Sequence, residues 1–155
     1  MRNRRTKGLW IGLALTVLPS LACLTPREGR NVRITRAELA ASLGAYAAEG
    51  EARVEHADDD YVELHAHGPS GAVMLGLSVD EGLESIPDGE SASVDVLGCG
   101  GPYEGGWSFD RHARAAWIRV EPANEGRRRV FVRAEWSDGS TARATFEYEL
   151  PEPRS

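Results

Sequence analysis

Two histidines placed two residues apart, His65 and His67, have the residue type and spacing that could support metal chemistry. They alternate with apolar residues, so both imidazoles are expected on the polar side of one strand, together with the carboxylate of Glu63. A zinc site has three or four protein ligands, and the other two histidines do not obviously complete such a set. A three-residue loop at 58–60 would pair Val54 with Leu64. This pairing would send His56 to the apolar face, and His112 is far along the chain. His65 and His67 are therefore candidate metal ligands, with solvated surface histidines as the favoured interpretation.

A glycine-rich stretch, residues 98–110, is the second candidate site. Five glycines surround Tyr103, Trp107 and Phe109, which predicts a mobile loop that presents aromatic rings, a combination found at binding sites for sugars and extended peptides. The stretch has none of the glycine spacings that bind phosphate groups. Tyr103, Trp107 and Phe109 are thus candidate ligand-binding residues. The alternative is a connection between strands whose aromatic side chains close one end of the fold.

The remaining polar clusters favour structural roles. Residues 58–60 are three aspartates without the ligand spacing of an EF-hand, which indicates a solvated hairpin tip. Residues 127–129 are three arginines in a predominantly acidic chain, where ion pairs with glutamates or protection of a sheet edge are favoured and the broad basic face of a nucleic-acid-binding protein is excluded. No G-x-S-x-G, H-E-x-x-H or C-x-x-C pattern is present, so an enzyme is the least favoured interpretation and no cofactor is expected.

The first 22 residues differ from the rest of the chain in charge and hydropathy. They contain four basic and no acidic residues, whereas the remaining residues contain 14 basic and 24 acidic ones, a net charge of −10 against −6 for the whole chain. An apolar run over residues 9–18 ends at Pro19. This order predicts a secretory signal peptide over residues 1–22. The run is shorter than the ~20 apolar residues of a membrane-spanning helix, so an uncleaved anchor is only an alternative.

The end of this signal, Leu21-Ala22-Cys23, resembles the lipobox of bacterial lipoproteins. The resemblance covers the N-terminal segment only. It implies that the thiol of Cys23 receives a diacylglyceryl group and that the N-terminal lipid anchors the protein to a membrane of the bacterial cell envelope. Two or more acyl chains hold a protein on a membrane where a single chain does not. Ser20-Leu21-Ala22 is also a small-x-small site for the general signal peptidase, so a soluble secreted or periplasmic protein is the alternative.

The chain has two cysteines, and the fate of one decides that of the other. If Cys23 is acylated, Cys99 has no intramolecular partner and is expected to be a buried thiol that acts as a small hydrophobic residue. If Cys23 is not acylated, the oxidising compartment permits a Cys23–Cys99 disulfide.

These residues must be positioned by a tether, one helix and a series of strands. Residues 23–34 contain proline, glycine and four charges, which predicts a tether, and residues 35–155 are expected to form a single domain. Thr35 and Glu38 have the spacing of a capping box. Leu39 and Leu43 continue at helical spacing. The sequence therefore predicts a helix at about residues 36–48.

From residue 51 onward the hydrophobic period changes to two, which indicates strands with one buried face and antiparallel pairing. A loop of three residues, 137–139, places the inward residues of the last two strands on the same face. We expect an antiparallel β-sandwich or curved sheet of about seven strands. The seven alternating segments cover residues 54–56, 62–66, 73–79, 92–96, 116–120, 130–136 and 142–150.

Three classes of function are consistent with these features. The favoured one is a noncatalytic, lipid-anchored envelope protein that acts as a structural or interaction module, with an envelope protein or a glycan as its partner. The second is a ligand-binding lipoprotein that uses the loop at 98–110. The third is a hydrolase built from dispersed residues. The exposure of the three loop aromatics distinguishes the first two classes.

Overall fold

The computed structural model describes residues 31–103 and 105–149, which form strands and two short 3₁₀ helices. The 3₁₀ helices are η1 (Leu83–Ser85) and η2 (Asn124–Gly126). The strands are β1 (Arg33–Leu43), β2 (Tyr46–Glu51), β3 (Arg53–Ala57), β4 (Tyr61–Gly68), β5 (Gly71–Ser78), β6 (Ser91–Ser93), β7 (Asp95–Gly101), β8 (Phe109–His112), β9 (Ala115–Pro122), β10 (Arg128–Glu135) and β11 (Thr141–Glu149). No helix in the described part of the chain is long and apolar enough to cross a membrane.

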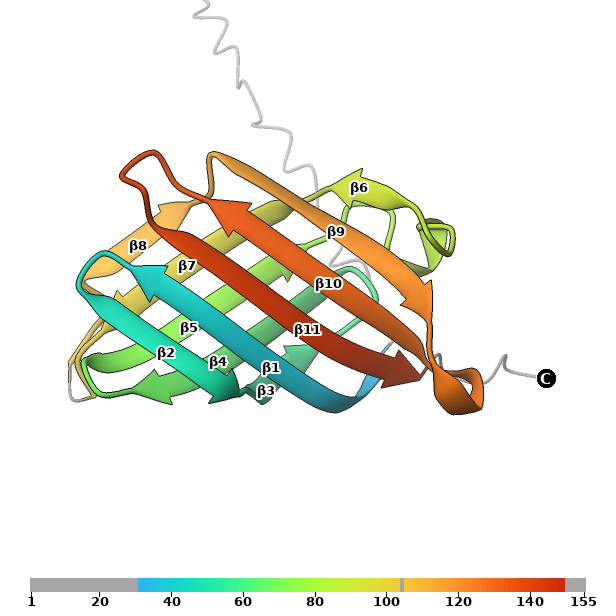
Figure 1. The fold of residues 1–155 in the computed structure, drawn as a ribbon, viewed down its shortest axis with the longest axis horizontal. Helices are drawn as coiled ribbons and strands as arrows, with labels where there is room; N and C mark the ends of the chain where they lie inside the picture. The colour runs from blue at the N-terminus through green and yellow to red at the C-terminus, as the bar shows by residue number, and fades with distance from the viewer. Residues whose placement is uncertain (1–30, 104, 150–155) are drawn as a thin grey trace, which may run out of the picture.

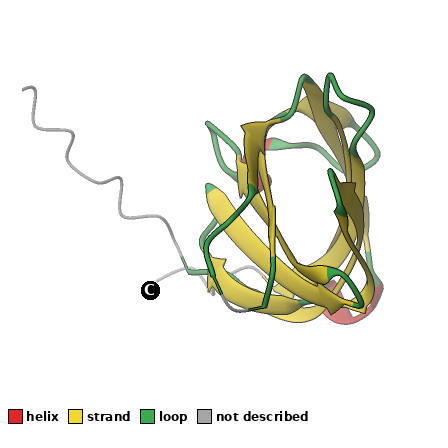
Figure 2. Cartoon of the chain, turned by 90° about the vertical axis from the view of Figure 1, so that its left-hand side faces the viewer, coloured by secondary structure: helices red, strands yellow, loops and turns green. Residues whose placement is uncertain are grey.

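The strands form two antiparallel sheets in a sandwich-like arrangement (Figure 1). The six-stranded sheet has the order β2-β1-β11-β10-β9-β6, and the five-stranded sheet has the order β3-β4-β5-β7-β8. In Figure 1 the six-stranded sheet lies in front, and its strands cross the direction of those behind. Figure 2 shows the two layers from the side.

The chain changes sheets four times, and at two of these places the strands are nearly continuous. β2 and β3 are separated only by Ala52, whose backbone N–H donates to the carbonyl of Ala37 on β1 (2.9 Å). β6 and β7 are separated only by Val94, whose N–H donates to the carbonyl of Ala116 on β9 (3.2 Å). Backbone hydrogen bonds therefore support these two changes of sheet, and the other two changes are made through residues 79–90 and 113–114.

The hydrophobic core lies between the sheets. Side chains along a strand alternate between its two faces, so burial of one set leaves the other set on the outer face of each sheet. The outer face of the five-stranded sheet therefore carries the polar residues of β3, β4, β7 and β8. The largest fully buried side chains are Tyr148, Phe146, Leu39, Leu43, Leu64, Leu75, Leu77, Leu83 and Ile118.

Six of the seven predicted segments each lie in one strand, with at most one residue beyond its ends, and the predicted antiparallel pairing is confirmed. The segment at 92–96 is instead divided between β6 and β7, which belong to different sheets, and the described residues form eleven strands where about seven were expected.

The final hairpin has the predicted register, since Ala134 lies opposite Ala142 and the N–H of Trp136 donates to the carbonyl of Ser140 (3.0 Å). Three residues remain in the loop, and Gly139 has a φ of 87°, which glycine adopts without steric cost.

The predicted helix at residues 36–48 is wrong, because these residues form most of β1, a turn and the start of β2. Leu39 and Leu43 are four residues apart, a spacing that fits the helical period and also the even period of a strand. Alanines, which favour helices over strands, occupy other buried positions of β1. Pairing of β1 with both β11 and β2 provides contacts that outweigh local preference.

The residues predicted to cap that helix have other partners. The hydroxyl of Thr35 accepts a hydrogen bond from Arg127 (3.5 Å), and Glu38 forms an ion pair with Arg36. The predicted tether at residues 23–34 overlaps β1, which begins at Arg33, and Val32 is buried. The signal peptide, Cys23 and the first part of the tether lie outside the described residues.

The cluster of arginines at residues 127–129 forms ion pairs, as predicted. Arg127 and Arg129 both approach Glu147, at 3.6 Å and 2.5 Å. Arg128 points the other way, toward the end of the core, and bonds Asp88 (2.9 Å), the carbonyl of Leu83 and the hydroxyl of Tyr148.

Candidate functional site

The outer face of the five-stranded sheet carries all four histidines of the chain, and we call it the histidine face. His65 and His67 lie on β4, as the alternation predicted, with His56 on β3 and His112 on β8. Glu63 lies opposite His56 on β3 and opposite Gly76 on β5. This row of paired residues continues across β7 and ends at His112 on β8. Residues that are far apart in the sequence therefore share one surface.

His56 reaches this face because of a bulge in β3. The predicted pairing of Val54 with Leu64 is confirmed, and simple alternation would then send His56 into the apolar core. The register shifts between Val54 and His56, so that His56 lies opposite Glu63 and its side chain is 52% exposed. A bulge inserts one extra residue into a strand and turns the following side chain to the other face. The expectation of a core-facing His56 was therefore wrong.

The glycine-rich stretch contributes two strands and a short loop to this site. Residues 98–101 belong to β7 and residues 109–112 form β8, so the loop spans only residues 102–108. Gly101 allows the loop to lie close to the sheet, because a Cβ there would meet the carbonyl oxygen of Gly106 at 2.7 Å and the Cα of Trp107 at 3.1 Å. The N–H of Ser108 also donates to the carbonyl of Gly100 (2.8 Å).

Two of the predicted loop aromatics contact the two predicted histidines. Trp107 meets His65 edge-on, with ring centroids 6.0 Å apart and an interplanar angle of 68°. Tyr103 stacks on His67, with centroids 5.4 Å apart and an angle of 12°. The hydroxyl of Tyr103 also donates to the carbonyl of Gly68. Tyr103 remains 58% exposed and Trp107 41% exposed, so both rings are open to a ligand.

Phe109, the third predicted loop aromatic, belongs to the core and not to the site. It is 4% exposed and packs edge-on against Trp136, with centroids 6.0 Å apart. Phe109 lies opposite Gly100 in the first position of β8, where the side chain points inward. The loop aromatics therefore divide into one core residue and two exposed rings.

Carboxylates hold three of the four histidines in place. His65 Nε2 lies 2.7 Å from Glu63, which also accepts a hydrogen bond from the hydroxyl of Tyr61 (3.0 Å). Likewise His56 lies 2.7 Å from Asp58, and His112 lies 2.9 Å from Asp95. A carboxylate that accepts from an imidazole fixes the orientation of the ring.

Tyr61 is a site residue that was not singled out from the sequence. It packs over Gly76, where a Cβ would lie 2.8 Å from the tyrosine hydroxyl oxygen. Burial, reinforced by the hydrogen bond to Glu63, raises the pKa of Tyr61 to about 12. The signal was present in the alternation of residues 61–65, which places Tyr61, Glu63 and His65 on one side of β4.

Cys99 lies under this surface as a free, buried thiol. It is 2% exposed and donates a weak hydrogen bond to Asp110 (3.6 Å). Burial, with the nearby charge of Asp110, raises the pKa of the Cys99 thiol to about 12. A thiol in this environment stays protonated and is a poor nucleophile. The alternative Cys23–Cys99 disulfide involves a residue outside the described part of the chain.

The histidines do not gather around a common point. Within residues 31–103 and 105–149, no group of three or more histidine, cysteine, aspartate or glutamate side chains is arranged to hold a metal ion. His65 is bonded to Glu63 and His67 is stacked on Tyr103, so the two imidazoles have separate partners.

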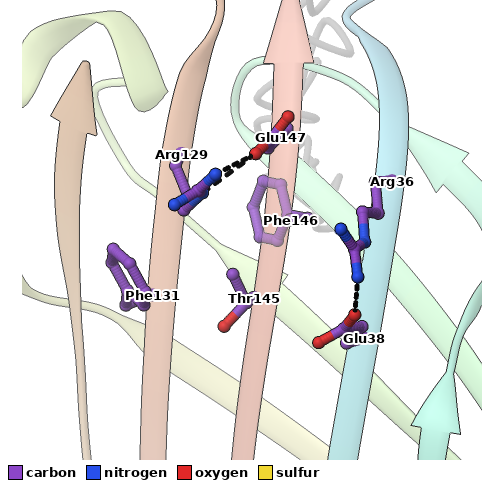
Figure 3. A pocket seen from close by; sticks show the side chains of 7 residues that line it. All are labelled: Arg36, Glu38, Arg129, Phe131, Thr145, Phe146 and Glu147. Atoms are coloured by element: carbon purple, nitrogen blue, oxygen red, sulfur yellow. Dashed lines mark hydrogen bonds and ion pairs between the residues drawn. The ribbon is translucent and has the colours of Figure 1, made fainter. Parts of the chain in front are cut away.

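The outer face of the six-stranded sheet has a shallow groove of about 330 Å³ between β1, β10 and β11 (Figure 3). Its charged side chains pair with one another, Arg129 with Glu147 and Arg36 with Glu38. The hydrogen bond from Arg129 is the main reason that the pKa of the Glu147 carboxyl is lowered. Because these charges are already paired, we assign no ligand to this groove.

The histidine face is therefore the best candidate site, since two features predicted separately meet there. No protein-family model, curated protein or solved structure matches this chain.

Proposed function

We propose that this protein is a noncatalytic, lipid-anchored component of the bacterial cell envelope whose folded part binds a glycan on the histidine face. The observation that carries the proposal is the pair of exposed rings, Trp107 and Tyr103, held above His65 and His67. An exposed tryptophan of this kind offers a flat apolar surface on which the C–H groups of a sugar ring can pack.

Polar groups beside the rings support a glycan as the ligand. The carboxylates of Glu63 and Asp110 and the imidazole of His67 lie on the same face as Trp107. Carboxylate oxygens accept hydrogen bonds from sugar hydroxyls, and an imidazole can donate or accept one. The combination of an apolar ring face and nearby polar groups is the usual composition of a site that binds a small polar ligand.

The state of the nearby reactive groups supports a role without catalysis. Cys99 and Tyr61 could serve as nucleophile and general acid, but their pKa values are raised to about 12. Efficient acid–base groups have pKa values near the working pH. Both residues therefore keep their protons at neutral pH and act as packing and hydrogen-bonding groups.

Acylation of Cys23 would place this site close to a membrane. Residues between Cys23 and the start of β1 at Arg33 span at most about 35 Å when fully extended. The acidic composition of the chain after residue 22 disfavours electrostatic adhesion to anionic lipids. The lipid, and not surface charge, is then the route to the membrane.

The test of binding uses the full chain in detergent and a panel of immobilised bacterial envelope glycans. Wild type should bind at least one glycan, and Trp107→Ala and Tyr103→Ala should lose most of that binding. Trp117→Ala is the matched control, because Trp117 is 36% exposed on the other sheet. Unchanged glycan binding in the Trp107 and Tyr103 variants, or binding to envelope peptides alone, would refute the proposal.

The test of anchoring is metabolic labelling with radioactive palmitate in a bacterial host. Wild type should be labelled and should fractionate with membranes, and Cys23→Ala should lose both properties. Cys99→Ala is the control for the second thiol. An unlabelled wild-type protein would refute the proposed lipid anchor and would leave the proposed glycan site untouched.

A further inference from the structure

A second groove lies on the outer face of the six-stranded sheet, on the side of the molecule opposite the histidine face. It has a volume of about 470 Å³ and runs along β11, β1 and β2. We call it the alanine groove, because its floor is made of small side chains. The outward-facing strand residues that line it are Ala40, Ser42, Ala47, Glu49, Thr141 and Arg143, and Pro69 between β4 and β5 also lines it.

Opposite charges stand on the two walls of the alanine groove. Strand register places Arg143 opposite Ala40 on one side, and Glu49 opposite Ala40 on the other. The two charged residues are thus two strand spacings apart, about 9–10 Å between backbones. Ala40 between them is too short to reach either side chain.

Both charges lack a partner within the part of the chain that the structure describes. Among residues 31–103 and 105–149, neither Arg143 nor Glu49 forms a hydrogen bond or an ion pair. The groove in Figure 3 is the contrast, since its arginines and glutamates pair with one another. The alanine groove therefore leaves one positive and one negative group available to a ligand.

Arg143 also faces a second positive charge on the adjacent strand β10. Arg133 lies directly opposite Arg143 across β10 and β11, and like charges in this position destabilise a sheet. Arg133 is itself satisfied, because it pairs with Glu135 (2.9 Å) and lies over the ring of Trp117 (5.4 Å). An anion bound to Arg143 would relieve the remaining repulsion.

We propose that the alanine groove binds a short peptide with free ends, whose carboxylate pairs with Arg143 and whose ammonium group pairs with Glu49. The separation of the walls matches about two to three extended residues. A floor of methyl and hydroxyl groups accommodates small side chains without steric conflict. This site is separate from the histidine face and does not depend on glycan binding there.

The test uses nuclear magnetic resonance of the full chain in detergent, labelled at its alanine methyl groups, with trialanine as the probe. Trialanine should shift the signals of Ala40 and Ala47, and acetylated, amidated trialanine should not. Arg143→Gln and Glu49→Gln should each weaken the affinity by about threefold to fivefold, the effect expected of an exposed ion pair. Arg36→Gln, in the groove of Figure 3, should leave the affinity unchanged.

A charge reversal makes the test independent of the fold of any single variant. The double variant Arg143→Glu/Glu49→Arg should bind trialanine again, in the reversed direction. Without peptide, Arg143→Gln should melt at a higher temperature than wild type, because the repulsion with Arg133 is removed. The proposal is overturned if wild type shows no shifts with trialanine, or if the blocked peptide or the two single variants bind equally well.

Discussion

The imidazole of His65 and the indole of Trp107 lie edge to face, with centroids 6.0 Å apart, although one residue is on β4 and the other is in the loop after β7. The two are brought together by pairing of β4 with β5 and of β5 with β7. This contact joins the two regions that the sequence had marked as candidates for chemistry. Trp107 is exposed and can contact a ligand, whereas Phe109, from the same glycine-rich stretch, is buried in the core.

The different burial of Phe109 and Trp107 predicts that their substitution by alanine lowers the free energy of unfolding by different amounts. Phe109→Ala removes a core side chain that is 4% exposed and should lower the free energy of unfolding by about 3–5 kcal/mol. Trp107→Ala should change it by less than about 1 kcal/mol, because the ring is 41% exposed. Urea unfolding followed by circular dichroism measures both. Equal costs would mean that Trp107 is a structural residue.

The close approach of the loop to Gly101 predicts that a single methyl group displaces it. Gly101→Ala places a Cβ 2.7 Å from the carbonyl oxygen of Gly106, so the loop must move away from the sheet and glycan binding should fall by about tenfold or more. Gly106→Ala is the control, since a Cβ there meets nothing within 4 Å. Titration calorimetry compares the two, and the same affinity for both variants would show that the position of the loop does not matter.

The raised pKa values of Cys99 and Tyr61 predict loss of stability in alkali. Burial raises the Cys99 pKa from 9.0 to about 12 and the Tyr61 pKa from 10.0 to about 12. The unfolded chain releases these protons at lower pH than the folded chain, so stability is fully present below about pH 9 and falls as pH rises toward 12. Urea midpoints measured between pH 8 and pH 11 should decrease for wild type. Cys99→Ala and Tyr61→Phe should each flatten this decrease, and parallel curves would contradict the assignment.

Arg128 and Arg129 point to opposite faces of β10, so their substitution by alanine should lower the free energy of unfolding by different amounts. The Arg128 side chain is 14% exposed and donates to the carbonyls of Leu83 and Ile86 and to the hydroxyl of Tyr148. Arg128→Ala leaves these acceptors unsatisfied and should cost about 2–4 kcal/mol. Arg129→Ala removes a side chain that is 46% exposed and should cost less than about 1 kcal/mol. Chemical unfolding distinguishes the two variants, and a larger effect at Arg129 would contradict the account.

Much of the sheet structure could be predicted from the sequence, because its strands have one buried face. The alternation of β4, β5, β9, β10 and β11 is regular, and the parity of the last loop correctly gave the pairing of Ala134 with Ala142. β1 was mistaken for a helix because Leu39 and Leu43 fit either period and their partners on β11 are distant in sequence. β8 was missed because only Phe109 among its four residues is buried.

The candidate site was predicted in pieces that could not be assembled from the sequence. His65, His67, Tyr103 and Trp107 were each identified, but their contacts depend on the order of β4, β5 and β7 in the sheet. The place of His56 depends on a bulge, which shifts the face of every later side chain and has no distinct signal in these residues.

The most direct test of the glycan-binding account is the response of individual indole N–H signals in a nuclear magnetic resonance titration of the full chain. Addition of a glycan that binds should shift and broaden the signal of Trp107, whereas the signals of Trp117 and of the buried Trp136 should stay in place. A glycan that binds and shifts the Trp117 signal while leaving that of Trp107 unchanged would contradict the account.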